Sequence, residues 1–374
     1  MAEIRGNGCR RGRRRAWLLR RAWLLAGALA LAPVVAPPLR VKAAEPERIG
    51  VSYQPSLYWA LPFYIATQKG WWKEVGLEPT FAVFPAGAPQ VAAAQAGSWD
   101  VGGTGSVPAI LGAARFGLLT IGLTNDESKT NALMVRAARH DAILKDPKQL
   151  AGQKLLVTTN STADYAARAC LRKWGLGPRE MRFVNLGQAQ IISAMIADAG
   201  EVVGVWAPNT YTLEEKASAQ VLCSGADADA MVPGALITRA DFAKAHPDAV
   251  AKFLAVYLRG WGWAKANPKE AHDMAKRFYA EGGVEASDHA IDQEFALRPT
   301  YALDAQLKAM ARADGPSQVD GWFSRIGTFM AEVGTIAQAP DAKGYIDDAF
   351  MKRVAADPKL RAFATEFDGV AAPH

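Results

Sequence analysis

The prediction of the fold starts from residues 97–108, which read GSWDVGGTGSVP. Asp100–Thr104 is typical of a short buried strand. Val107–Ala114 is typical of a helix, with Pro108 in the first turn, where the missing N–H costs nothing. Glycine and hydroxyl residues join the two segments. A strand that enters a helix through such a turn is the building unit of a parallel α/β sheet.

The same unit recurs on both sides of this stretch. Gly70 is expected to end the first helix. Beyond it, the apolar segments Leu133–Arg136 and Ala235–Thr238 are expected to carry the chain from one α/β unit to a second and back. The other predicted strands are 48–53, 77–84, 118–123, 155–158, 182–185 and 202–206, and the other predicted helices are 61–69, 90–96, 163–174 and 189–198. The C-terminal part is expected to be mainly helical.

The first 43 residues are typical of a cleavable export signal. An arginine-rich stretch, Arg10–Arg21, precedes the apolar stretch Ala22–Ala36, and small residues around Ala43 suit cleavage. Two Arg-Arg pairs, each followed by Ala-Trp-Leu-Leu, resemble a twin-arginine signal, and the ordinary secretory route stays open as an alternative. We therefore expect a periplasmic protein. No cysteine directly follows the apolar stretch, so no lipid anchor is expected.

The basic character of the chain lies in this leader. The whole chain has a formal charge of +6, but residues 1–43 hold ten of the 43 basic and one of the 37 acidic side chains. The remainder has a net charge of about −3 and no basic run with interleaved aromatic residues, so no nucleic-acid partner is expected. Cys170 and Cys223 follow the leader. We expect two separate buried thiols, with a disulfide as the alternative.

Four predicted strand-to-helix joints carry residues suited to ligand capture, at residues 85–87, 104–106, 158–162 and 206–209. In parallel sheets, ligands bind beyond the carboxyl ends of the strands, where helix N-termini offer free N–H groups to an anion. Ordinary helix capping is the alternative for each joint, because Ser, Thr and Gly are common there. Tyr58 is a further aromatic candidate. The candidate ligand contacts are Tyr53, Gln54, Trp59, Gly87, Thr104, Gly105, Ser106, Asn125, Ser161, Thr162, Trp206 and Asn209. Trp71, Trp72, Trp261 and Trp263 are expected to be packing residues.

Signals for an enzyme or a metal site are weak. The five histidines do not stand at metal-ligand spacing, and neither a Gly-x-Ser-x-Gly elbow nor a phosphate-binding loop occurs. Asp100, Asp126 and Glu127 are interpreted as a solvated loop edge, with a functional carboxylate group as the alternative. No catalytic residue, no cofactor and no metal are expected.

Several segments taken together resemble a known family. They are 61–77 (LPFYIATQKGWWKEVGL), 93–105 (AAQAGSWDVGGTG), 150–154 (LAGQK) and 205–208 (VWAP). In this order they are similar to the nitrate/sulfonate/taurine branch of ABC-transporter substrate-binding proteins, a family that includes binding proteins for thiamine-pyrimidine precursors. The resemblance covers roughly residues 48–275 well.

The resemblance implies an α/β, two-lobed periplasmic-binding-protein fold of type II with two chain crossovers. Lobe 1 would comprise 44–134 and 237–374, and lobe 2 would comprise 135–236. It implies a small-molecule ligand and, as partners, a membrane permease with its cytoplasmic ATPase, and we expect a monomer. An alkanesulfonate or taurine-like anion is the favoured ligand. The family's ligand contacts fall on the joints described above.

The alternatives are a pyrimidine precursor or an aromatic carboxylate as the ligand, a sensory binding subunit, and an enzyme related to pyrimidine synthases. Many sulfonate binders carry acidic residues where this chain has Ser106 and Ala207. No Arg or Lys stands at a matched contact. Helix N-termini and neutral donors are therefore expected to bind an anion.

Overall fold

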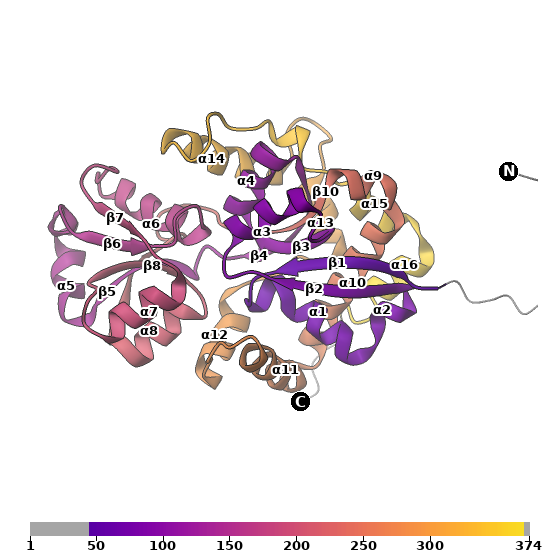
Figure 1. Ribbon diagram of the computed structural model, residues 1–374, viewed down its shortest axis with the longest axis horizontal. Coiled ribbons are helices and arrows are strands. Elements are labelled where there is room, and N and C mark those ends of the chain that lie inside the picture. Colours follow the sequence, from indigo (N-terminus) through magenta and orange to yellow (C-terminus); the bar gives the residue numbers. More distant parts are fainter. Residues whose placement is uncertain (1–44, 370–374) are drawn as a thin grey trace, which may run out of the picture. The chain divides into compact units, whose positions relative to one another are not determined.

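The computed structural model describes residues 45–369, which contain two five-stranded mixed sheets (Figure 1). We call the part built on the sheet β2-β1-β3-β10-β4 lobe 1, and the part built on the sheet β7-β6-β8-β5-β9 lobe 2. The strands are β1 (Glu47–Tyr53), β2 (Leu77–Val83), β3 (Val101–Gly105), β4 (Leu118–Asp126), β5 (Asn131–Arg136), β6 (Lys154–Val157), β7 (Arg182–Asn185), β8 (Val202–Trp206), β9 (Ala219–Ser224) and β10 (Pro233–Arg239).

Helices accompany both sheets. Those of lobe 2 are α5 (Ala137–Lys145), α6 (Thr162–Lys173), α7 (Gln188–Ile196) and α8 (Asn209–Ala217). Those of lobe 1 are α1 (Leu57–Lys69), α2 (Trp71–Glu74), α3 (Gly87–Ala93), α4 (Ser106–Phe116), α9 (Ala240–Ala245), α10 (Pro247–Ala266), α11 (Pro268–Glu281), α12 (Asp288–Leu297), α13 (Leu303–Met310), α14 (Gln318–Glu332), α15 (Ala349–Ala356) and α16 (Pro358–Ala364). Short 3₁₀ helices lie at Ala94–Ala96, Pro147–Leu150 and Ala342–Gly344. The C-terminal part is mainly helical, as predicted.

Each sheet combines four strands that run in the same direction with one antiparallel strand, and that antiparallel strand brings the chain from the other lobe. In lobe 1, β10 pairs antiparallel with both β3 and β4. In lobe 2, β5 pairs antiparallel with both β8 and β9. The chain therefore changes lobes in residues 127–130 and 225–232. Strands β5 and β10 contain the two predicted crossover segments, and we propose lobe boundaries just before these strands instead of after residues 134 and 236.

Helix α1 begins four residues earlier than the sequence predicts, because its Pro62 does not break it. A proline at this position leaves the carbonyl oxygen of Tyr58 without an intrahelical N–H donor. The hydroxyl of Tyr257 on α10 donates to that oxygen at 2.7 Å. A Cβ on Gly260 of α10 would lie 2.6 Å from the Cβ of Pro62, so glycine is what lets the two helices approach there.

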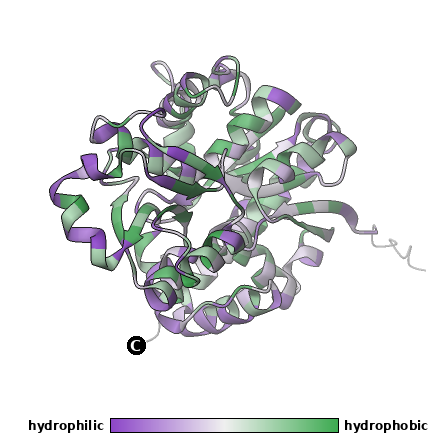
Figure 2. Cartoon of the chain, turned by 60° about the vertical axis from the view of Figure 1, so that its left-hand side comes forward, coloured by the Kyte–Doolittle hydropathy of each residue, from purple (hydrophilic) through white to green (hydrophobic). Residues whose placement is uncertain are grey.

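The core of lobe 1 is rich in aromatic side chains. Trp71, Trp72, Trp261 and Trp263 are all buried, which confirms that they are packing residues. The ring of Trp261 stacks on Tyr58 with a centroid separation of 4.5 Å. Hydrophobic residues concentrate on the strands, and hydrophilic residues on the outer sides of the helices (Figure 2). Such a distribution is what burial of apolar surface produces.

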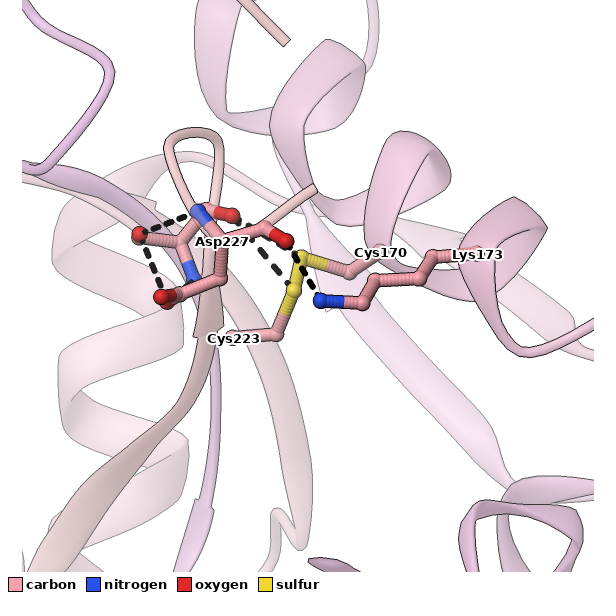
Figure 3. Close-up of a disulfide and its surroundings, with 5 residues drawn as sticks. Cys170, Lys173, Cys223 and Asp227 are labelled. Carbon is pink, nitrogen blue, oxygen red and sulfur yellow. Dashed lines mark hydrogen bonds between the residues drawn. A yellow bond between two sulfur atoms is a disulfide. The ribbon is translucent and has the colours of Figure 1, made fainter. Parts of the chain in front are cut away.

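Cys170 and Cys223 form a disulfide, so the prediction of two separate thiols is wrong (Figure 3). The bond joins α6 to β9, and both residues are buried. Nearby, the Nζ of Lys173 donates to the carbonyl oxygen of Asp227 at 2.5 Å. The Oδ2 of Asp227 accepts from the backbone N–H of Ser224 at 2.8 Å and from its hydroxyl at 2.7 Å. The turn after β9 is thus tied to α6 by covalent and polar contacts.

The predicted export signal at 1–43 lies outside the described residues. Within residues 45–369, no helix combines the length and the apolar character that a membrane crossing requires.

Candidate ligand-binding site

A cavity of about 410 Å³ lies between the two lobes. Its lobe 2 wall comes from the end of β8, from α7 and from α8, and its lobe 1 wall comes from the loops after β1, β2 and α11. The lining residues are Gln54, Pro55, Pro85, Gln188, Ala189, Ile192, Ser193, Ile196, Trp206, Pro208, Asn209, Thr212, Lys216, Gly283, Val284 and Glu285.

Three of the twelve candidate residues line this cavity. Gln54 directly follows β1, Trp206 ends β8, and Asn209 begins α8. All three therefore lie where a strand ends or a helix begins, as expected for ligand contacts in α/β sheets. Trp206 is only 8% exposed, so its indole forms part of a buried wall.

Three amide side chains, those of Gln54, Gln188 and Asn209, supply neutral polar groups to the cavity. The Nδ2 of Asn209 donates to the Oε1 of Gln188 at 3.0 Å, and the Nε2 of Gln188 donates to the hydroxyl of Thr158 at 3.0 Å. Gln54 donates to the side-chain oxygen of Gln90. Each amide is thus held in one orientation before any ligand arrives, which reduces the entropy cost of binding.

Thr104 lies next to this amide network, and neither Thr104 nor Ser106 lines the cavity. Both are fully buried. The hydroxyl of Thr104 is 3.5 Å from the side-chain amide of Gln54. Among the described residues, the hydroxyl of Ser106 has no hydrogen-bond partner. A buried hydroxyl without a partner is unfavourable, so Ser106 holds an unused donor at the start of α4.

Lobe 1 and lobe 2 approach each other closely at the adjoining joints. A Cβ on Gly105 would lie 2.6 Å from the Cγ2 of Thr162 at the start of α6. The hydroxyl of Ser161 accepts from the backbone N–H of Asp164 at 3.2 Å, so Ser161 caps α6. Gly87 packs against Pro108, since a Cβ there would lie 2.3 Å from the proline Cγ. None of these four joint residues lines the cavity.

Two of the aromatic candidates lie elsewhere than the sequence predicts. Tyr58 and Trp59 belong to the first turn of α1 and not to a strand-end loop. Both are buried, and the Nε1 of Trp59 donates to the Oε1 of Glu127 at 2.7 Å. Tyr53 ends β1 and packs edge-on against Phe81, with a centroid separation of 6.1 Å. These three rings contact protein groups and do not line the cavity.

Asn125 and Glu127 lie where the chain leaves lobe 1. Asn125 is fully buried and accepts from the hydroxyl of Thr124 at 2.8 Å; it does not line the cavity. The interpretation of Glu127 as part of a solvated loop edge is wrong, because its side chain is fully buried. Its Oε2 accepts from the Nδ2 of Asn131 at 3.0 Å, and Arg298 lies 3.7 Å from its Oε1.

We call Glu127, Glu294 and Arg298 the buried charge cluster. The Nη1 of Arg298 donates to the Oε2 of Glu294 at 2.9 Å, and the guanidinium lies 4.4 Å from the ring centre of Tyr58. Burial raises the pKa of both carboxyl groups, and the guanidinium opposes that rise. The cluster holds the crossover residue Glu127 against α1 and α12.

The cavity also contains an ion pair that the sequence did not indicate. Lys216 of lobe 2 pairs with Glu285 of lobe 1. The hydrogen bond and the charge of Lys216 hold the pKa of Glu285 below its usual range. All other lining side chains are uncharged. The cavity therefore has one cationic group, and that group is already paired with a carboxylate.

Sequence reasoning missed most of the lobe 2 wall. Gln188, Ile192 and Ile196 recur at helical spacing on one face of α7, and Asn209, Thr212 and Lys216 do so on α8. A weak signal exists, because Ile196 is a large apolar residue that is 49% exposed. Amphipathic spacing alone does not tell a cavity wall from a core face.

The lining residues are mainly apolar and amide side chains. They include neither His nor Cys, and Lys216 and Glu285 are the ionisable side chains among them. Within residues 45–369, no group of three or more His, Cys, Asp or Glu side chains is placed to hold a metal ion. The arrangement can enclose a small molecule between apolar walls and neutral hydrogen-bonding groups.

Known proteins share both this sequence pattern and this fold. The chain is 29% identical over 232 residues to a Bacillus subtilis (strain 168) protein that carries the provisional name of an aliphatic sulfonates-binding protein; the match covers 61% of this chain and 68% of the relative. It is 29% identical over 217 residues to the taurine-binding periplasmic protein of Escherichia coli (strain K12), covering 56% and 64%.

A solved structure shows the same architecture. The alkanesulfonate-binding protein SsuA from Xanthomonas axonopodis pv. citri, bound to MOPS, superposes with a TM-score of 0.67 at 19% identity, covering 82% of this chain and 99% of that one. This likeness confirms the two-lobed type II binding-protein fold. A family model described as "NMT1/THI5 like" matches residues 59–271, which is more than half of the chain. The chain therefore belongs to the NMT1/THI5-like family.

Proposed function

We propose that this protein is the solute-binding component of an ABC importer and that it captures a small anion, of the alkanesulfonate or taurine type, between its two lobes. The observation that carries the proposal is the cavity of about 410 Å³, which is lined from both lobes by apolar and amide side chains. A ligand that contacts both lobes at once favours the closed arrangement of the lobes, because the open one offers only half of the contacts. The names of the taurine-binding and sulfonate-binding relatives support the ligand class.

The location and partners follow from the same proposal. We propose a periplasmic protein that acts as a monomer and delivers its ligand to a membrane permease coupled to a cytoplasmic ATPase. The Cys170–Cys223 disulfide supports an oxidising compartment, since such bonds persist outside the cytosol. We further propose that the protein has no catalytic activity, which the lack of His and Cys in the cavity wall supports.

A thermal-shift screen tests the proposal. The panel contains taurine, straight-chain alkanesulfonates and nitrate, together with a pyrimidine and an aromatic carboxylate. A ligand present at a hundred times its dissociation constant stabilises the folded state by about 2.7 kcal/mol, which raises the Tm by several degrees. We expect the largest rise with an alkanesulfonate. No shift with any compound of the panel would contradict the proposal.

An aromatic ligand is the second candidate, and the residues that line the cavity favour it. Trp206 offers a ring face, and Pro55, Pro85 and Pro208 add flat apolar walls. Amides can hydrogen-bond a neutral heterocycle as well as an anion. A larger Tm rise with the pyrimidine or the aromatic carboxylate than with any sulfonate would favour this candidate.

A further inference from the structure

Lys216 and Glu285 are the two ionisable side chains among the residues that line the cavity, and they come from opposite lobes. Lys216 lies on the same face of α8 as Asn209 and Thr212, which also line the cavity. A cation in the last turn of a helix is favoured by the partial negative charge of that helix end. The ammonium group is thus held at the cavity wall by its helix as well as by its partner.

Glu285 is a weakly held partner. Its side chain is 86% exposed, whereas that of Lys216 is 44% exposed. The carboxylate therefore stands at the mouth of the cavity in contact with water, and the stem of Lys216 lies deeper. Exposed ion pairs contribute little to stability, because water solvates both charges almost as well. Replacing the Glu285 carboxylate by the anionic group of a ligand beside Lys216 would therefore cost little free energy.

Two roles are open to this ion pair. It can be an ion pair that holds the two lobes together. Arg172 of α6 and Glu332 of α14 form such an interlobe pair at 2.7 Å, and neither of them lines the cavity. Alternatively, Glu285 can be a counter-ion that a ligand displaces. The Lys216–Glu285 pair differs from the Arg172–Glu332 pair because it lies on the cavity wall. This position favours the second role, since the ammonium group of Lys216 is the one positive charge there that can attract an anion.

We propose that Lys216 is the residue that selects an anionic ligand in this cavity, and that Glu285 neutralises it until the ligand's anionic group takes its place. The inference rests on the proposed function and specifies how that function obtains charge selectivity. The amides and Trp206 would contact the neutral part of the ligand, and the anionic group would face the mouth of the cavity at α8. Because Glu285 competes for the same ammonium group, removing its charge should improve anion binding.

Two probes of the same shape test this proposal, butanesulfonate and its uncharged analogue butanesulfonamide, with affinities measured by titration calorimetry. Lys216→Gln should weaken butanesulfonate binding by roughly tenfold or more, the range expected for a charge-assisted hydrogen bond. Lys216→Arg should restore much of it. Glu285→Gln should strengthen butanesulfonate binding by roughly two- to fivefold. Neither glutamine variant should change butanesulfonamide binding appreciably.

Glu332→Gln is the matched control, because it removes an exposed carboxylate from an interlobe ion pair away from the cavity. It should leave both affinities unchanged. Weaker binding of both probes to Glu285→Gln would identify the pair as one that holds the two lobes together and overturn the inference. Equal butanesulfonate affinity of wild type and Lys216→Gln would also overturn it. If wild type binds neither probe, the proposed function in its sulfonate form fails, and the inference fails with it.

Discussion

Arg298 is a buried cation that serves two buried carboxylates. The exposed fraction of its side chain is 2%, and those of Glu127 and Glu294 are 0%. Arg298→Met should therefore lower the free energy of unfolding by roughly 3–5 kcal/mol, because it leaves two buried carboxylates without a cation. Glu127→Gln should cost much less, since the amide oxygen can still accept from Trp59. Urea denaturation of both variants measures the difference.

The loss in Arg298→Met should also depend on pH. Burial raises the folded-state pKa of both carboxyl groups above the unfolded value, so the folded state binds protons more readily. The penalty for their charge is then absent at low pH and grows as the pH rises from the unfolded pKa through the folded pKa. The variant should be closer to wild type at pH 5 than at pH 8. Equal losses at both pH values would contradict this account.

At the scale of elements, the disulfide fixes α6 to β9. It closes a loop with a sequence separation of 53 residues. The double variant Cys170→Ala/Cys223→Ala should unfold with a free energy lower by roughly 2–4 kcal/mol, because its unfolded chain is less restricted. Urea denaturation checks this, and a reductant should destabilise wild type but leave the double variant unaffected. Neither cysteine lines the cavity, so ligand affinity should stay unchanged.

Local sequence signals predicted the boundaries of secondary-structure elements best. Glycine and hydroxyl residues correctly marked the starts of α4 and α6, since caps and turns depend on the residues immediately around them. Helix α1 was predicted too short, since the expected helix began at Leu61 and the observed one begins at Leu57. The hydroxyl of Tyr257, about two hundred positions away in the chain, is what makes Pro62 tolerable inside the helix. Such a partner leaves no trace in a local window.

At the scale of the whole molecule, the two lobes approach each other closely at Gly105. Its φ of −80° is open to any residue, so alanine there meets no backbone strain and its only conflict is with Thr162. Gly105→Ala should hold the lobes apart and weaken ligand binding by roughly 1–3 kcal/mol, the usual cost of overpacking. With saturating ligand, small-angle X-ray scattering should show a larger radius of gyration for Gly105→Ala than for wild type.

Thr162→Ser supplies the control, because serine lacks the Cγ2 atom that an alanine Cβ would meet. The next nearest Thr162 atom is its Oγ1, at 3.4 Å from that Cβ. The double variant Gly105→Ala/Thr162→Ser should therefore recover the wild-type affinity and compactness. If Gly105→Ala alone binds as tightly as wild type, the closed arrangement of the lobes does not depend on this contact.

The sequence by itself determined nine of the ten strands, the two passages between sheets and the family, because periodicity, caps and motifs are local; it missed β9, α5 and α8. It also placed Gln54, Trp206 and Asn209 at strand ends that line the cavity. Only the tertiary structure brought together Lys216 with Glu285, Arg298 with Glu127, and Cys170 with Cys223. The physical reason is that each of these pairs joins residues far apart in the chain, and their contact depends on how the packed elements place them.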